Sequence, residues 1–395
     1  MTDRDTTKSI VLFIGFITVT FNLRPALTSV GPLIDAIKQD LVMSAGMAGL
    51  LITLPVLAFA VLSIFAPAFG RKVGNEKAIF LGMWVLAAGL LVRSSGLLSG
   101  LFIGTVLAGM GIAVGNVLVP GLIKKNFPSR IPLMMGVYTA GLGVSAGIAS
   151  GISVPLSEGL HWGWQKSLAS WAILAVLGAL FWWPQVRRSR AAAGDGIAKP
   201  PGGHLLGSWL AWQVTVYSGC SAFIFYCLVT WLPVIIQGYG FSASTAGWMA
   251  SILPFLGIPA SFVTPILAGK LDNQRGLVAG ICVFVLCGLL GLTLAADSTW
   301  VLVASIVVIA ISLGAGFSLA LTFLVLRADT VEDVASLSGM AQSFGYCFAA
   351  IGPMFTGFLF DLSGSWTLPL IMLMIVAVIL MLSGLGAGRR AFVRR

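Results

Sequence analysis

The sequence predicts an all-α membrane protein with twelve transmembrane helices, arranged as two pseudo-symmetric six-helix bundles. Of its 395 residues, 58% are hydrophobic and 9% are charged, and a water-soluble domain of this composition would expose large apolar patches. Apolar runs of roughly 18 residues or more recur along the chain, each long enough to cross a ~30 Å hydrocarbon core as a helix. Short motifs also recur between the two halves, which indicates a duplicated bundle.

The first six spans precede residue 185. The first, at 10–36, is interrupted by polar residues and by Pro25, which removes a backbone donor and disfavours α geometry at Arg24. A local break is therefore expected beside Arg24. No small-residue cleavage site follows this span, so we interpret it as a mature helix rather than a signal peptide. The other five are expected at 44–69, 77–95, 98–123, 132–156 and 166–184.

Six further spans are expected at 209–236, 244–269, 276–295, 299–326, 332–360 and 366–388. The polar segment between the two sets divides the chain into a bundle at 1–184, a cytoplasmic linker at 185–208 and a bundle at 209–395. The pattern Ser-Ala-x-x-Ala-Gly at 44–49 recurs at 242–247. Two parallel six-helix repeats are typical of transporters whose halves rock around a central site.

The net charge of +10 indicates topology rather than a polyanionic partner. Of the 23 lysines and arginines, all but Arg24, Lys38, Arg93 and Lys166 lie in the tails and loops on the side of the N-terminus. This asymmetry is the positive-inside rule, so we predict a multi-pass protein of the cell inner (plasma) membrane with both termini cytoplasmic. The partners that we expect are the lipid bilayer and a small-molecule substrate, with no nucleic acid, and we expect a monomer.

Nothing in the sequence indicates catalysis. The five cysteines lie within predicted spans without C-x-x-C spacing, and His161 and His204 fall in loops on opposite sides. A membrane-embedded enzyme or receptor would need a catalytic constellation or a sensory domain, and the sequence contains neither. We therefore predict no enzyme activity, no metal site and no cofactor.

Arg24 is a permanently charged residue in the middle of the first predicted span. It lies roughly 20 Å from either end at ~1.5 Å per residue, too deep for easy snorkelling to a headgroup. Burying a cation there costs at least ~2.5 kcal/mol, so such residues usually face a polar cavity. Carboxylates such as Asp35 and Asp361 fall only at span ends or in loops and tails. We therefore predict an anionic or strongly polar ligand for Arg24, although it could instead brace the bundle by pairing with helix carbonyls.

The loops after the second and eighth spans carry related basic motifs. Arg71, Lys72 and Gly74 form the first, and Asp272 belongs to the second. Together with the six-plus-six organisation, these loops resemble the major facilitator superfamily (MFS) over essentially the whole chain. The resemblance implies the MFS fold and a gating role for the two loops.

Three segments carry a narrower resemblance. Residues 22–33 read NLRPALTSVGPL and resemble the cyanate-transporter family. Residues 115–124, GNVLVPGLIK, and 337–343, LSGMAQS, resemble the 2-nitroimidazole-transporting branch of that family. Because the similarity is spread over several spans, it indicates membership of the family rather than the presence of one shared motif.

In the MFS fold the first, fourth, seventh and tenth helices line the central cavity, and this resemblance selects polar residues on or near those helices. The substrate-binding candidates are Arg24, Asn22, Thr28, Asn116, Tyr138, Tyr217, Gln342 and Tyr346, with Gln213, Tyr226 and Trp231 ranked lower. Gln213 with Tyr217, and Gln342 with Tyr346, are four residues apart and share a helix face.

These observations predict a secondary transporter that moves a small polar or anionic solute, cyanate-like or nitroimidazole-like, by alternating access, with Arg24 as the central substrate-binding cation. The alternative is a multidrug or metabolite exporter of the same fold in which Arg24 is structural. Exporters of this kind usually carry Gly-Pro in the fifth helix, whereas here Gly147 is followed by Ile148, which disfavours the alternative.

Overall fold

Helices form all the regular secondary structure in the part of the chain that this computed structural model describes, residues 3–43, 45–192, 205–295 and 298–393. Helices satisfy every backbone polar group within one segment, which an apolar environment demands. Within the described residues, eleven helical segments are long and apolar enough to cross a membrane, and the bent pair Leu54–Ser63 and Ala66–Val73 makes a twelfth if it is one span. Most of the predicted linker, residues 193–204, and Ser44 of the repeated motif lie outside the described residues.

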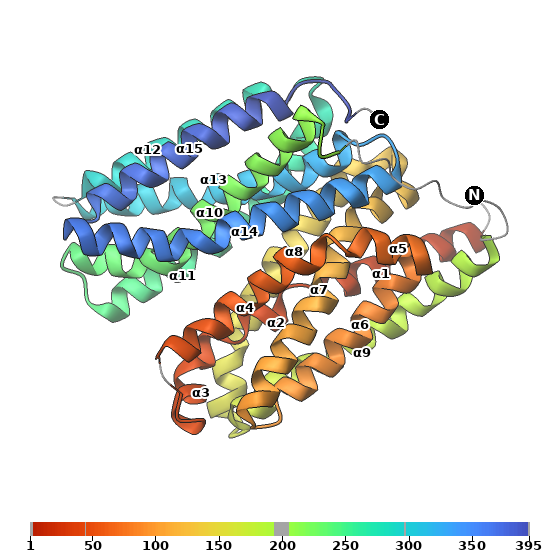
Figure 1. Cartoon of the computed structure of the whole chain (residues 1–395), viewed down its shortest axis with the longest axis horizontal. Helices are drawn as coiled ribbons and strands as arrows, with labels where there is room; N and C mark the ends of the chain where they lie inside the picture. The colour runs from red at the N-terminus through yellow and green to blue at the C-terminus, as the bar shows by residue number, and fades with distance from the viewer. Residues whose placement is uncertain (1–2, 44, 193–204, 296–297, 394–395) are drawn as a thin grey trace. The chain divides into compact units, whose positions relative to one another are not determined.

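The chain divides into two compact units (Figure 1). The first comprises residues 1–122 and 144–200, and the second comprises residues 123–143 and 201–395. The segment 123–143, at the end of the fourth span and the start of the fifth, therefore packs with the second unit. The division at 185–208 that the sequence suggests stays a prediction.

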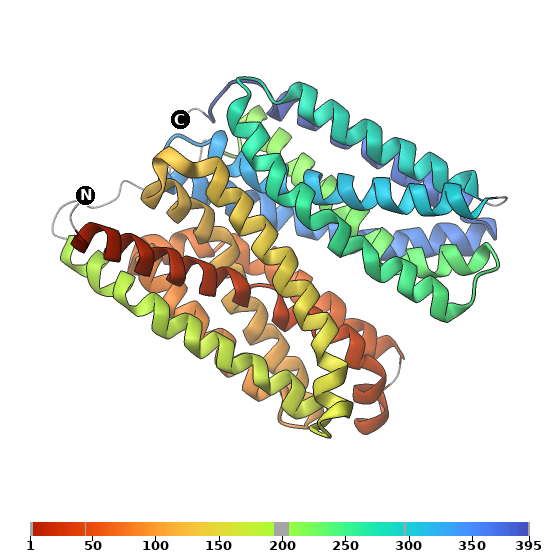
Figure 2. The same cartoon turned by 180° about the vertical axis from the view of Figure 1, so that it is seen from behind.

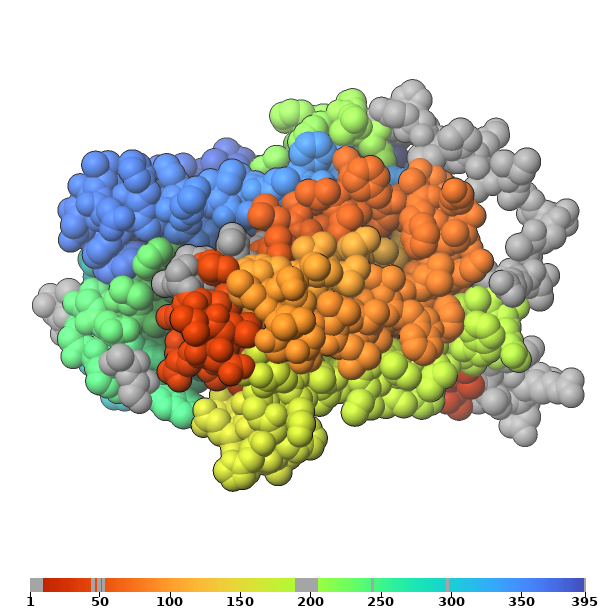
Figure 3. Space-filling view, turned by 60° about the horizontal axis from the view of Figure 1, so that its bottom comes forward, coloured from red at the N-terminus to blue at the C-terminus, as the bar shows by residue number. Residues whose placement is uncertain are grey.

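The helices of the first unit are connected by short turns. In order they are α1 (Asp3–Asn22), α2 (Pro25–Thr28), the 3₁₀ turn Gly31–Leu33, α3 (Ile34–Asp40), α4 (Ala45–Ser63), α5 (Ala66–Val73), α6 (Asn75–Arg93), α7 (Leu98–Asn126), the 3₁₀ turn Pro128–Arg130, α8 (Ile131–Val154), the π turn Pro155–Gly159 and α9 (Gly163–Ala192). In Figure 2, α9 runs alongside α1. Figure 3 shows the orange atoms of α6 beside the yellow-green atoms of α9 on the surface of this unit.

The second predicted span is not one straight helix. α4 ends at Ser63 and α5 starts at Ala66, and the two axes differ by 55°. Pro67 has no N–H to donate to the carbonyl of Ser63 and is favoured in a first helical turn, so the chain begins a new helix there. α5 then continues to Val73, past the end at residue 69 that hydropathy suggests.

The second unit contains six long helices. They are α10 (Trp209–Gly238), α11 (Ala243–Lys270), α12 (Arg275–Thr293), α13 (Thr299–Leu326), α14 (Val331–Ser363) and α15 (Thr367–Ala387). Side-chain hydroxyls of Ser208, Ser242, Ser298 and Thr330 accept a backbone N–H in the first turn of α10, α11, α13 and α14, which satisfies donors that a helix start leaves open.

Glycines set the closest helix contacts of the second unit. A Cβ on Gly219 of α10 would lie 3.1 Å from Cα of Gly345 on α14, and one on Gly257 of α11 would lie 3.0 Å from the Ala310 carbonyl of α13. Small residues let backbones approach in this way where van der Waals packing has to hold helices together. The pairs α10–α14 and α11–α13 therefore pack backbone against backbone at these glycines.

Candidate functional site

The first span is broken where its sequence carries Arg24. α1 ends at Asn22, the Leu23 N–H donates to the Thr20 carbonyl at 3.2 Å, and α2 begins at Pro25. The Arg24 side chain is half-buried. The break predicted from Pro25 is confirmed, and it places a guanidinium on a two-residue turn within a membrane span.

Two other candidates of the first span bond to neighbouring helices. Thr28 Oγ1 donates to the Ala146 carbonyl of α8 at 3.1 Å. Asn22 Nδ2 donates to the carbonyls of Thr18 and Leu174 at 2.8 and 3.0 Å, so both amide hydrogens are used by backbone. In this structure Asn22 therefore braces α1 against α9 at the edge of the break.

The fourth span lies directly beside the break. Leu23 is fully buried, and a Cβ on Gly115 of α7 would lie 2.5 Å from its Cδ2. Asn116, the next residue of α7, is also buried. Of the predicted site residues in the first unit, the structure thus brings the helix of Asn116 against the turn that carries Arg24.

In the second unit the structure brings Tyr226 and Tyr346 together. Their ring centroids are 6.5 Å apart at an interplanar angle of 63°, and Gln342 lies one turn before Tyr346 on α14. Tyr217 packs instead on Phe323, with centroids 5.5 Å apart. Its hydroxyl is buried without a hydrogen-bond partner among the residues that the structure describes.

The remaining substrate-site candidates are held by the protein. Tyr138 is fully buried on α8. Gln213 Oε1 accepts from Arg389 Nη2 at 3.1 Å, and Trp231 Nε1 donates to the Pro353 carbonyl at 2.8 Å. These hydrogen bonds connect Gln213 of α10 to the C-terminal segment after α15, and Trp231 of α10 to α14.

The loop after the second span has the geometry that its glycine predicts. Arg71 and Lys72 are exposed in the last turn of α5. Gly74 follows with φ 90° and ψ 137°, a conformation that L side chains rarely adopt. The motif therefore needs glycine at this position for a backbone reason, independently of any gating role.

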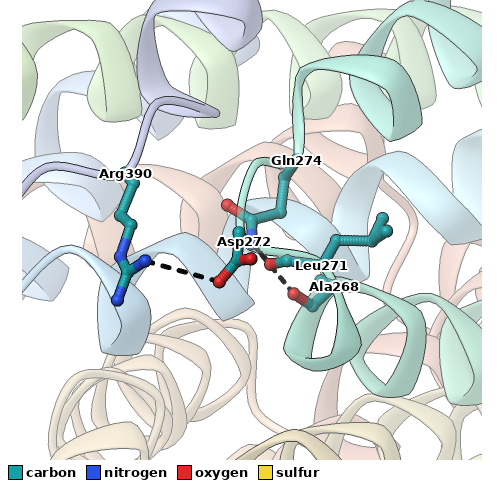
Figure 4. A network of polar contacts seen from close by, with 5 residues as sticks. All are labelled: Ala268, Leu271, Asp272, Gln274 and Arg390. Carbon is teal, nitrogen blue, oxygen red and sulfur yellow. Dashed lines mark hydrogen bonds and ion pairs between the residues drawn. The ribbon is translucent and has the colours of Figure 1, made fainter.

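The corresponding loop of the second unit joins α11 to α12 (Figure 4). Asp272 pairs with Arg390 at 3.5 Å, but both side chains are largely exposed, and such a pair contributes little. Gln274 beside it is buried, and its Nε2 donates to the carbonyls of Ala268 and Leu271 at 2.9 and 2.6 Å. These bonds satisfy carbonyls that the end of α11 leaves open.

Sequence reasoning missed Arg327, which anchors this loop. Its side chain is 4% exposed, its Nε donates to the Ala387 carbonyl at 2.6 Å, and its Nη2 donates to Gln274 Oε1. The guanidinium lies 5.3 Å from the Phe323 ring centroid, and the Arg327 carbonyl accepts from Val393 N at 2.7 Å. Burial lowers the pKa of Arg327 to about 10. The only signal in the sequence was a lone arginine directly after the tenth span.

Arg93 was also missed. By sequence it lies at the end of the third span, and of the non-cytoplasmic cations only Arg24 was placed at mid-depth. In the structure Arg93 is the last residue of α6, and its buried side chain donates from Nη1 to the carbonyl of Ala26, two residues beyond Arg24. Separately, the described residues contain no cluster of three His, Cys, Asp or Glu side chains that could hold a metal ion.

Long apolar helices, one of them broken beside a charged residue, are the architecture of a polytopic membrane protein. Residues 10–350 match the family model described as Major Facilitator Superfamily, and the chain belongs to that family. It is therefore a multi-pass membrane protein and a secondary transporter for a small-molecule substrate in a lipid bilayer.

Relatives agree over nearly the full length. The chain is 43% identical over 386 residues to the uncharacterized transporter YycB of Bacillus subtilis, covering 98% of this chain and 95% of the relative. It is 35% identical over 390 residues to the 2-nitroimidazole transporter of Escherichia coli, covering 98% and 97%. It is 26% identical over 358 residues to the cyanate transport protein CynX of Escherichia coli, covering 90% and 91%. The resemblance inferred from the motifs is confirmed.

Solved structures support the same fold. The proton:xylose symporter XylE superposes with a TM-score of 0.76 at 11% identity, covering 97% of this chain and 95% of that one. The transporter FucP superposes with a TM-score of 0.72 at 12% identity, covering 95% and 98%. At these sequence identities the structural similarity is evidence for the fold alone. The predicted fold class is confirmed.

Proposed function

We propose that this transporter moves a small polar or anionic solute, cyanate-like or nitroimidazole-like, by alternating access, with Arg24 as the central cation that binds it. The observation that carries the proposal is the break between Asn22 and Pro25, which leaves Arg24 half-buried on a two-residue turn within a span. Irregular backbone at membrane depth is tolerated only where protein surrounds it or where it lines a wet cavity.

The guanidinium suits both solutes. It carries up to five N–H donors in a planar fork, which matches the oxygen pair of a nitro group and the charge of a cyanate ion. Two relatives that cover most of the chain are a 2-nitroimidazole transporter and a cyanate transport protein. A solute with several acceptors and little apolar surface is what these two names have in common.

The other site residues are proposed in supporting roles. Thr28 and Asn116 lie on the two helices that meet at the break, and the Tyr226–Tyr346 pair offers flat aromatic surface to a planar ring. Gln342 supplies an amide one turn from Tyr346. We further propose that both termini are on the cytoplasmic side of the inner membrane, because the lysines and arginines are concentrated in the loops and tails on that side. We also propose that the protein acts as a monomer.

The test is uptake into proteoliposomes of labelled cyanate and 2-nitroimidazole by wild type, Arg24→Ala and Arg24→Lys. Lys166→Gln is the matched control, since it removes an exposed cation that also lies outside the cytoplasmic set. We expect Arg24→Ala to abolish uptake and Lys166→Gln to retain it. Unchanged uptake of every anionic or nitro solute by Arg24→Ala would refute the proposal and favour an exporter in which Arg24 is structural.

A further inference from the structure

We infer that the first unit holds a second anion-binding site, formed by the free edge of the Arg93 guanidinium beside the broken first span, and that it takes a small planar oxyanion of the nitrate or formate class. The inference does not require that Arg24 binds the transported solute. It concerns a residue that neither the family resemblance nor the proposed substrate site includes.

Arg93 reaches the break because of where it stands on its helix. It is the last residue of α6, and helical side chains point back toward the helix N-terminus. The long side chain therefore folds back along the third span until Nη1 contacts the Ala26 carbonyl at 2.5 Å. The residue is 1% exposed, so essentially no water reaches its charge from outside.

Close helix packing seals the site on the side of α7. A Cβ on Gly104 would lie 2.6 Å from Cα of Arg93, and one on Gly89 would lie 2.5 Å from the Ala108 nitrogen. The backbones of α6 and α7 thus approach closely at both ends of the last turn of α6, at Gly89 and at Arg93. A charge held in such a place interacts strongly with any partner, because the local dielectric is low.

The hydrogen bonds of Arg93 leave one specific edge of its guanidinium open. Nη1 is bonded to Ala26, whereas Nε and Nη2 have no hydrogen-bond partner in the described part of the chain. Nε and Nη2 form one of the two edges of the guanidinium at which a pair of N–H bonds runs parallel, and this geometry binds a carboxylate or nitrate oxygen pair. The open donors are therefore those of a bidentate oxyanion site.

A neutral carbonyl compensates this charge only in part. Buried charges in proteins are normally paired as well as hydrogen-bonded, and Arg93 has no ion pair with any residue that the structure describes. The hydroxyl of Ser29, three residues after Ala26, is likewise fully buried and has no partner among the described residues. A monoanion would neutralise the guanidinium and accept from both of its open donors.

The first experiment measures anion-dependent thermal stability of the full-length purified protein. Sodium nitrate, formate and chloride are titrated at constant ionic strength into wild type, Arg93→Gln, Arg93→Lys and the control Lys166→Gln. We expect nitrate and formate to raise Tm saturably in wild type and Lys166→Gln, since a ligand that binds only the folded state stabilises it. Arg93→Gln should lose the shift, and Arg93→Lys, which has charge without a parallel edge, should need roughly tenfold more anion.

Three results would overturn the inference. The first is the same anion-dependent shift in Arg93→Gln as in wild type, which would leave Arg93 only a brace for the Ala26 carbonyl. The second is an unchanged half-saturation in Arg93→Lys, which decides the matter even if Arg93→Gln does not fold. The third is an equal response to chloride, which would exclude the planar oxyanion class.

A second arm identifies the source of the anion. Counterflow of labelled formate and nitrate is measured in proteoliposomes containing wild type, Arg24→Ala or Arg93→Lys. A resident ion is indicated if Arg24→Ala keeps the thermal shift and neither anion is transported. A binding site on the transport pathway is indicated if both substitutions slow the flux of the same anion. Either result supports a site at Arg93, whereas failure of Arg24→Ala to affect any flux bears on the proposed function alone.

Discussion

Replacing Arg327 with Gln should destabilise the second unit strongly. The substitution removes the donors to the Ala387 carbonyl and to Gln274 Oε1, and it removes the cation over the Phe323 ring. A hydrogen bond to a charged group contributes ~1.5–3 kcal/mol, and acceptors left buried without donors add to the loss. Allowing for new bonds made by the glutamine, we expect a loss of about 3 kcal/mol.

Arg275→Gln is the matched control for this prediction. Arg275 belongs to the same loop region and donates from Nε to the Leu385 carbonyl at 3.1 Å, but its side chain is exposed. An exposed interaction of this kind contributes less than ~1 kcal/mol. Unfolding of both variants in detergent, followed by circular dichroism against denaturant or temperature, compares the two losses directly. A loss for Arg327→Gln within 1 kcal/mol of the control would refute the reasoning.

The same comparison has a predicted pH dependence. Burial lowers the pKa of Arg327 from the ordinary arginine value to about 10 in the folded protein, so both states are protonated at neutral pH and the difference in stability between wild type and variant should be constant there. Between about pH 10 and the higher pKa of an unperturbed arginine, the unfolded state binds more protons than the folded state, and stability rises with pH in that case. Wild type should therefore gain relative to Arg327→Gln only as pH rises through 10.

Three further substitutions test the roles assigned to particular contacts. Asn22→Leu removes the two amide donors that brace α1 and should cost ~1–3 kcal/mol in thermal or denaturant unfolding; an unchanged stability would contradict that bracing role. Gly74→Ala forces a side chain into φ 90° and should destabilise the folded protein by ~1 kcal/mol or more. The control Gly276→Ala adds a methyl group into open space within α12 and should leave stability unchanged or raise it. Equal effects of the two substitutions on Tm would argue against backbone strain at Gly74. Asp272→Asn removes only the exposed pair with Arg390 and should change stability by less than ~0.5 kcal/mol, so a large loss of Tm would show that the pair is worth more than its exposure suggests.

Local chemistry in the sequence was enough to predict the break at Arg24. Proline removes its own N–H and restricts the residue before it, and these effects depend on two neighbouring residues only. The same reasoning applies to Pro67, where the structure bends the second span by 55°. Hydropathy alone joined the two pieces of that span into one helix, because both are apolar and a 20-residue window does not register a change of axis.

The roles of individual polar side chains were harder to predict. Asn22 and Gln213 look like ligands of a cavity because they are amides within spans, yet the structure gives Asn22 two backbone acceptors and gives Gln213 a bond from Arg389. Whether an amide faces a cavity or a carbonyl depends on which residue of another helix lies opposite. That partner is 152 positions away for the Leu174 carbonyl bound by Asn22 and 176 for Arg389.

The sequence by itself determined that this protein is a helical membrane transporter of the MFS, since hydropathy, charge asymmetry and motif spacing can all be read from the order of the residues. Only the tertiary structure decided which cations are buried. Arg93 and Arg327 both stand at or just beyond the end of an apolar span, where a charged residue normally faces water. A long side chain can fold back toward a neighbouring helix, and the carbonyls that receive it are available only because that helix ends or breaks at that depth.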